Sequence, residues 1–184
     1  YAINAVYTED AYLNDINSMI VLEFAVDPYV VLAVLNSSLV TFWFIYTFDK
    51  LQRKTFPQFK VKELKQFPLP KRVFEQEALG QLARAMQTLQ VQYHADVART
   101  LAVLQAEYAP KHMSKRLQTF FDLGWNEFVD ELSKQRVNLS LKQKEQLYDW
   151  FRDKQAHFTA LAQQLDDLNA RIDRTVATCF GLDD

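Results

Sequence analysis

Regularly spaced apolar residues fill the second half of the chain and predict two long helices. From Glu75 to Tyr108 they recur at steps of three and four, the spacing of one face of an α-helix. A second pattern of this kind starts at Ser140, which forms the spacing of a capping box with Gln143. A short amphipathic connector helix is expected around 125–135. Two long helices joined by a short connector are expected to lie antiparallel and bury their apolar seams on each other. The seam positions are Leu79, Leu82, Met86, Leu89, Tyr93, Val97, Leu101, Leu104 and Tyr108 in the first helix, and Leu147, Phe151, Phe158, Leu161, Leu165, Leu168, Ile172 and Val176 in the second.

The first part of the chain has a different pattern, rich in Tyr, Val, Ile and Phe. Residues 18–26 predict a strand and residues 1–7 a weaker one, because β-branched and aromatic residues favour strands. Residues 28–48 carry no charge and predict one fully buried helix with apolar side chains on all sides. Asp27 is its expected N-cap, with Pro28 at the first helical position.

The uncharged stretch 28–48 also has the length of a membrane span, and Lys50, Arg53 and Lys54 follow it as a cationic flank. A span would place the polar run 36–38 in the middle of the hydrocarbon, where unpaired polar groups are costly. The buried helix is therefore favoured, and no membrane partner is expected.

Prolines shape the segment that follows. Residues 55–59 are expected to be extended, residues 61–66 to form at most a short helix, and residues 67–70 to leave as an extended segment. Together these patterns predict an α+β, mostly helical fold. A small β-containing part, residues 1–74, includes the helix 28–48 and the segment 49–72, and a long antiparallel helical hairpin or coiled coil follows over residues 75–184.

Composition argues against most catalytic chemistry. The chain has only 3 glycines, spaced too far apart to cradle a phosphate group. His94, His112 and His157 have no ligand partner at helical or loop spacing, and Cys179 has no second cysteine nearby. No cofactor-binding or metal-binding residue and no catalytic residue is therefore expected in this chain.

The single cysteine also indicates a compartment. One thiol forms no internal disulfide and no leader pattern opens the chain, so the cytoplasm is the expected location. The first residue is Tyr1, and we expect the chain to be a piece of a longer protein.

Positive charge is concentrated in one segment. No Lys or Arg precedes Lys50, yet residues 49–72 contain eight cations and two acids, a net +6 (8 − 2), while the whole chain has a net charge of −2. Phenylalanines and glutamines alternate with these cations. Phosphate oxygens attract cations, and side-chain amides pair with base edges, so this combination favours binding to DNA. The candidate DNA-binding residues are Lys50, Gln52, Arg53, Lys54, Gln58, Lys60, Lys62 and Lys65.

Two other interpretations of this segment remain open. A lysine-rich run is often a solvated face. It is then the rim of a helical module whose seam docks a partner subunit, which is the alternative function from a different class. Asp49 followed by Glu63 and Lys65 also has the order of residues that hold a divalent ion in many nucleases, although the pattern is common by chance.

Several stretches resemble a known family. These are LAVLNSSLVTFWFIYTF (32–48), KLQRKTFPQFKVKELKQFPLP (50–70), FEQEALGQL (74–82) and IDRTVATCFGLDD (172–184). Together they resemble the C-terminal target-recognition domain of TaqI-like and type IIG restriction-modification enzymes, which belong to the adenine-specific DNA methyltransferases. The paired helices also resemble the spacer coiled coils of type I specificity subunits.

The resemblance implies a module that reads a short sequence of double-stranded DNA. Its second partner is then the methyltransferase or nuclease part of the same parent polypeptide, which the module positions. The catalytic Asn-Pro-Pro-Tyr motif and the cofactor loop of the methyltransferase are not found in this chain. S-adenosylmethionine and magnesium are accordingly expected for the parent enzyme and not for this chain.

Overall fold

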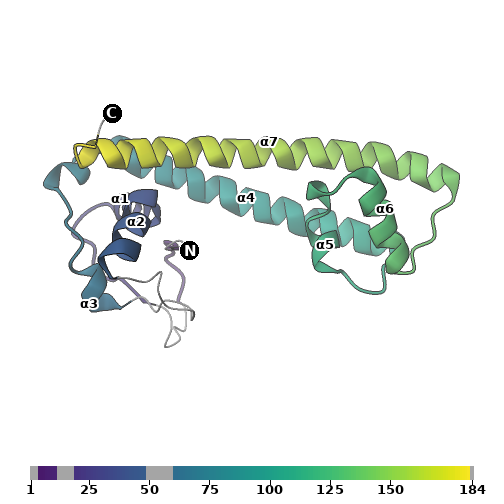
Figure 1. The fold of residues 1–184 in the computed structure, drawn as a ribbon, viewed down its shortest axis with the longest axis horizontal. Coiled ribbons are helices and arrows are strands. Elements are labelled where there is room, and N and C mark those ends of the chain that lie inside the picture. Colours follow the sequence, from purple (N-terminus) through teal and green to yellow (C-terminus); the bar gives the residue numbers. More distant parts are fainter. Residues whose placement is uncertain (1–3, 12–18, 49–59, 183–184) are drawn as a thin grey trace. The chain divides into compact units, whose positions relative to one another are not determined.

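The computed structural model describes residues 4–11, 19–48 and 60–182, and in these ranges every regular element is helical (Figure 1). The first elements are two short helices, α1 and α2, followed by α3 and the 3-10 turn η2. The long helix α4 comes next, then α5, the 3-10 turn η3, α6 and the long helix α7. Their bounds are α1 Pro28–Asn36, α2 Ser38–Thr47, α3 Val61–Leu64, η2 Lys71–Val73, α4 Glu77–Tyr108, α5 Lys115–Gln118, η3 Phe120–Asp122, α6 Trp125–Lys134 and α7 Leu141–Cys179.

The predicted β part is wrong for the residues that the structure describes. Residues 4–7 and 19–26 form no strand, and Ile20 and Leu22 are 55% and 75% exposed. Strand propensity becomes a strand only where a neighbouring strand pairs with the backbone. Ala5 instead pairs with a side chain, because its N–H donates to Asn36 Oδ1 (2.7 Å) and its carbonyl accepts from Asn36 Nδ2 (3.0 Å).

The uncharged stretch 28–48 forms two helices and not one. The predicted N-cap is confirmed, since the N–H of Tyr29 donates to Asp27 Oδ1 at 3.0 Å. Ser37 then interrupts the helix with an extended backbone, donates its hydroxyl to the carbonyl of Val34 (2.7 Å) and accepts from the N–H of Val40 (3.3 Å). A serine side chain that satisfies both helix ends favours a break over continuation.

Burial on all sides is also wrong for this stretch. Phe42 and Tyr46, one turn apart on α2, are 58% and 64% exposed. No single helix in the described ranges is long and apolar enough to cross a membrane. Helices α1 and α2 together have the required length and composition, but they are bent by 59° relative to each other.

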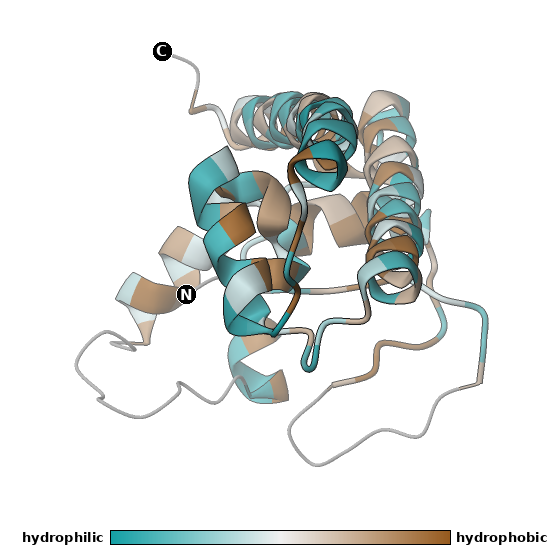
Figure 2. Cartoon of the chain, turned by 90° about the vertical axis from the view of Figure 1, so that its right-hand side faces the viewer, coloured by the Kyte–Doolittle hydropathy of each residue, from teal (hydrophilic) through white to brown (hydrophobic). Residues whose placement is uncertain are grey.

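The chain divides into two compact units. Unit 1 comprises residues 1–87 and 167–184, and unit 2 comprises residues 88–166. Hydrophobic and hydrophilic residues are interleaved along the helical ribbons (Figure 2).

The core of unit 1 joins three separate parts of the sequence. Apolar residues of α1 and α2 pack with the first turns of α4 and the last turns of α7. Residues early in α4 therefore meet residues late in α7, as expected for antiparallel helices. The buried members are Val30, Ala33, Val34, Val40, Phe67, Val73, Leu79, Leu82, Ala83, Ile172, Val176 and Cys179.

A charged clamp holds α1 to α4 at the edge of this core. Arg84 donates Nη1 to Asp27 Oδ2 (2.8 Å) and Nη2 to Asp27 Oδ1 (2.9 Å), and its guanidinium lies 4.2 Å from the centre of the Tyr29 ring. The hydrogen bond from Arg84 lowers the pKa of the Asp27 carboxyl, while partial burial acts in the opposite direction. Gly80 leaves room for the clamp, because a Cβ there would lie 2.6 Å from Asp27 Oδ2.

Unit 2 is built around aromatic rings. The end of α4, the elements α5, η3 and α6, and the start of α7 share one core (Figure 1). The rings of Phe128 and Phe151 are stacked 5.0 Å apart, and Phe120 lies 5.3 Å from Trp150. The predicted capping box of α7 is confirmed, since Ser140 N–H donates to Gln143 Oε1 (2.9 Å) and Gln143 N–H donates to Ser140 Oγ (3.4 Å).

Helix α6 ends in a left-handed residue that is not glycine. Arg136 has φ 66°, the N–H of Val137 donates to the carbonyl of Leu132 (3.0 Å), and the N–H of Arg136 donates to that of Ser133 (2.9 Å). This pair of bonds is the Schellman motif, in which glycine is usual. Helix α7 ends with the same pair of bonds and has Gly181 (φ 71°) at the corresponding position.

The clamp predicts a difference in acid stability. Asp27→Asn keeps an N-cap and removes the charge that Arg84 binds, so it is expected to cost less than about 1 kcal/mol at neutral pH for this partly exposed pair. Because the folded pKa of Asp27 is lowered, the pair stabilises the fold above the ordinary carboxyl pKa and this contribution is lost as pH falls through the folded value. In urea denaturation across acid pH, the Asn variant should therefore lose less stability than the wild type. Equal acid losses would contradict the clamp.

The end of α6 predicts a stabilising substitution. Arg136→Gly should raise the free energy of unfolding of unit 2 by on the order of 1 kcal/mol, because glycine adopts the left-handed conformation without a Cβ clash. Gly181→Ala is the reverse substitution at the end of α7. It should lower stability, because alanine is strained at φ 71° and its Cβ would lie 3.2 Å from Arg72 Nη2. Chemical denaturation measures both, and a destabilised Arg136→Gly protein would show that the arginine side chain supports the fold.

Candidate nucleic-acid interface

The basic segment is described from Lys60 onward. Five of the eight candidate DNA-binding residues, namely Lys50, Gln52, Arg53, Lys54 and Gln58, lie outside the described residues, as does the predicted extended stretch 55–59. The remaining three, Lys60, Lys62 and Lys65, are at or beside α3.

Helix α3 is short and is held at its start by its own glutamate. Glu63 Oε2 accepts the backbone N–H of Lys60 at 3.1 Å, and Glu63 is only 8% exposed. The carboxylate thus satisfies a backbone donor that the first helical turn leaves unpaired. This gives Glu63 a structural role and does not support the nuclease interpretation, whose other carboxylate, Asp49, lies outside the described residues.

The lysines around α3 are exposed. Lys60, Lys62 and Lys65 form no ion pair with a carboxylate of the described residues. Their ammonium groups are therefore available to an external anion, which is the property that a phosphate-binding surface requires.

Two members of the basic segment belong to the fold instead. Phe67 is buried, with its ring 4.9 Å from Trp43 and 5.5 Å from Phe180. Arg72 donates Nε to the carbonyl of Cys179, at the end of α7. The last carbonyls of a helix have no partner within the helix, so a cation there is favourable. Phe67 and Arg72 therefore anchor the segment that carries the exposed lysines.

Two of the stretches that resemble the known family, 32–48 and 172–184, contain side chains that stabilise the fold. The side chain of Asn36 binds both backbone groups of Ala5. Asp173 Oδ1 accepts the N–H of Ser38 at 2.8 Å, and so caps α2 from the far end of the sequence. Sequence analysis did not predict these roles, because the pairing of Asp173 with α2 depends on how α7 returns to unit 1.

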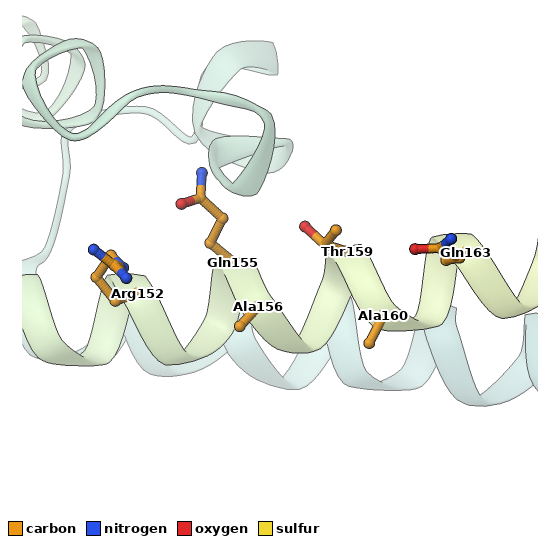
Figure 3. A pocket seen from close by; sticks show the side chains of 6 residues that line it. All are labelled: Arg152, Gln155, Ala156, Thr159, Ala160 and Gln163. Carbon is orange, nitrogen blue, oxygen red and sulfur yellow. The ribbon is translucent and has the colours of Figure 1, made fainter.

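An open hollow lies along α7 in unit 2 (Figure 3). One of its polar side chains takes part in the fold, since Gln155 donates Nε2 to the carbonyls of Phe121 (3.2 Å) and Leu123 (3.1 Å). Arg152 is its single ionisable residue, which offers no acid-base pair for catalysis. It is lined by Arg152, Gln155, Ala156, Thr159, Ala160 and Gln163.

The described ranges contain no cluster of side chains that could bind a metal ion. Within residues 4–11, 19–48 and 60–182, no group of three or more His, Cys, Asp or Glu side chains is placed to hold a metal ion. His157 lies near one carboxylate, with Nε2 3.0 Å from Asp96 Oδ2.

Comparison with known families identifies both parts of the chain. Residues 2–69 match the family model of the TaqI-like C-terminal specificity domain, which suggests recognition of a DNA sequence in a restriction-modification enzyme. Residues 74–176 match a domain of unknown function (DUF8810), and because this match spans more than half of the 184 residues, the chain belongs to that family. Comparisons with curated proteins and with solved structures found no match.

The role of Glu63 predicts that the chain has no nuclease activity of its own. The purified chain, incubated with duplex DNA, Mg²⁺ and S-adenosylmethionine, should neither cut nor methylate it. Gel electrophoresis and transfer of a labelled methyl group measure the two reactions. Mg²⁺-dependent cutting that disappears in the Glu63→Ala variant would overturn the structural role assigned to this residue.

Proposed function

We propose that this chain reads a duplex DNA sequence through the basic segment 49–72 and thereby positions a methyltransferase or nuclease that lies elsewhere in its parent polypeptide. The observation that supports this most directly is the set of exposed lysines at α3, which pair with no carboxylate of the described residues and lie on an element that Phe67 and Arg72 anchor. The lysines hold the phosphate backbone, and neighbouring amide side chains contact base edges.

The chemistry of the parent enzyme follows from the same proposal. Adenine methylation uses S-adenosylmethionine, and phosphodiester cleavage uses magnesium, and both belong to the part outside this chain. We propose the cytoplasm as the site of action, where a restriction-modification enzyme meets DNA.

The distinction between holding DNA and reading its sequence predicts two kinds of variant. Lys60→Ala, Lys62→Ala or Lys65→Ala should weaken binding to all duplexes about equally and reduce the slope of log affinity against log salt by about 0.9 for each lost phosphate contact. Gln52→Ala or Gln58→Ala should cost on the order of 1–3 kcal/mol on the cognate sequence alone, because an amide pairs with adenine in two hydrogen bonds.

The measurement is competition binding across a salt series with the full parent enzyme. The cognate sequence is first obtained by selecting bound duplexes from a random pool, and scrambled duplexes serve as competitors. Lys154→Ala, a lysine of α7 outside the basic segment, is the control. If the lysine and glutamine variants all bind like the parent at every salt concentration, the segment does not contact DNA and the helical interaction module becomes the better explanation.

A further inference from the structure

A second concentration of positive charge lies in unit 2. Residues 109–116 and 133–144 together contain seven Lys or Arg residues and no Asp or Glu, whereas unit 2 as a whole has ten of each sign. The charge is thus unevenly distributed within a neutral unit. The seven cations are Lys111, Lys115, Arg116, Lys134, Arg136, Lys142 and Lys144.

The fold of unit 2 brings these two stretches to the same end of the unit. Tyr108 at the end of α4, Val137 after α6 and Leu147 near the start of α7 belong to one core, so both stretches border the same part of unit 2. The N–H of Lys111 donates to the carbonyl of Gln135 at 3.0 Å, which joins the loop after α4 to the end of α6. We call the exposed cations of residues 109–116 and 133–144 the basic end of unit 2.

Two of the seven cations are neutralised by neighbouring carboxylates. Arg116 pairs with Glu127 at 2.7 Å and Lys134 with Glu131 at 3.3 Å. Hydrogen bonds hold both carboxylates in the charged form, since the N–H of Gly124 lowers the pKa of Glu127 and the hydroxyl of Ser114 lowers that of Glu131. All of unit 2 is described, and no carboxylate in it pairs with the five remaining cations, Lys111, Lys115, Arg136, Lys142 and Lys144.

Arg136 supplies an independent observation. It occupies the left-handed position at the end of α6, where an L-residue is less favourable than glycine, and its side chain is exposed. The exposed side chain makes no ion pair or hydrogen bond with the described residues that would offset this cost. A residue that is locally unfavourable and gains nothing inside the fold points to a role outside it.

We infer that the basic end of unit 2 is a second DNA-binding surface, which contacts the phosphate backbone of a duplex without reading its sequence. This inference rests on the proposed function, which places the chain on DNA through the basic segment of unit 1. The composition favours a nucleic acid over a protein partner, because protein interfaces have an apolar centre. Leu141 is the one large apolar residue that is exposed within the two stretches.

The test uses two charge-removing changes in the full parent enzyme, Arg136→Gly and the double variant Lys111→Gln, Lys115→Gln. Arg136→Gly removes a cation and also removes the backbone strain of an L-residue at φ 66°. Because this change should not destabilise the fold, weaker DNA binding by this variant could not be attributed to unfolding. Ala109→Gly is the matched control, because Ala109 is also left-handed (φ 43°) and carries no charge. Lys154→Gln controls for loss of a lysine elsewhere in unit 2.

Binding to long cognate and scrambled duplexes is measured across a salt series, with thermal melting of each protein. Arg136→Gly should bind both duplexes more weakly by the same factor, with a salt slope lower by about 0.9, and should melt no earlier than the parent. The double lysine variant should lower the slope by about twice as much. Ala109→Gly and Lys154→Gln should bind like the parent.

The outcomes separate this inference from the proposed function. If the unit 2 variants bind like the parent while Lys62→Ala binds more weakly, the second surface is refuted and the proposed function stands. If neither set of variants changes binding, both fail. Unchanged DNA binding with lost methylation by the full enzyme would instead assign the basic end to contact with the catalytic part and overturn the inference.

Discussion

The burial of α1 and α2 against the first turns of α4 and the last turns of α7 is the interaction on which unit 1 depends. Val34 of α1 and Val40 of α2 have little to pack on by themselves. They become part of a core only with residues of α4 and α7, such as Leu79 and Val176. The specificity-domain match ends at residue 69, inside this arrangement, and the second match begins at residue 74. The two matched regions are therefore interdependent in folding, because the core of the first is completed by the two ends of the second.

This dependence explains why several residues of the recognisable stretches serve the fold. Asn36 fixes the segment near Ala5, Ser37 ends α1 and starts α2, and Asp173 caps α2. Each satisfies a backbone group that otherwise lacks a partner, which is a requirement of the fold whatever DNA sequence is bound. Lys60, Lys62 and Lys65 are exposed instead, and their side chains form no ion pair with a carboxylate of the described residues.

Charge follows the same division between the two units. In unit 1, Arg84 and Arg72 are used inside the fold, one on Asp27 and one on the carbonyl of Cys179. In unit 2, Glu127 and Glu131 bind Arg116 and Lys134, and the other five cations of residues 109–116 and 133–144 are exposed. Net charge conceals this distribution, since a chain at −2 has exposed lysines at α3 and exposed cations in residues 109–116 and 133–144. An anion as large as DNA responds to the local surface, because salt screens charges more than about 10 Å away.

The sequence by itself determined the two long helices, the capping box at Ser140, the N-cap at Asp27 and the position of the basic segment, because each follows from spacing or from residues close together in the chain. It also carried the resemblance to specificity domains. The break at Ser37, the absence of strands from 4–7 and 19–26, and the burial of Phe67 were decided by the tertiary structure. At Ser37 the local bonds to Val34 and Val40 are joined by the cap that Asp173 of α7 gives to the N–H of Ser38. The strand-forming residues have no strand to pair with in residues 4–11, 19–48 and 60–182, and Phe67 meets Trp43 and Phe180 only when α7 returns to α2. Local pattern cannot specify such contacts, since they depend on which segments meet after the chain has folded.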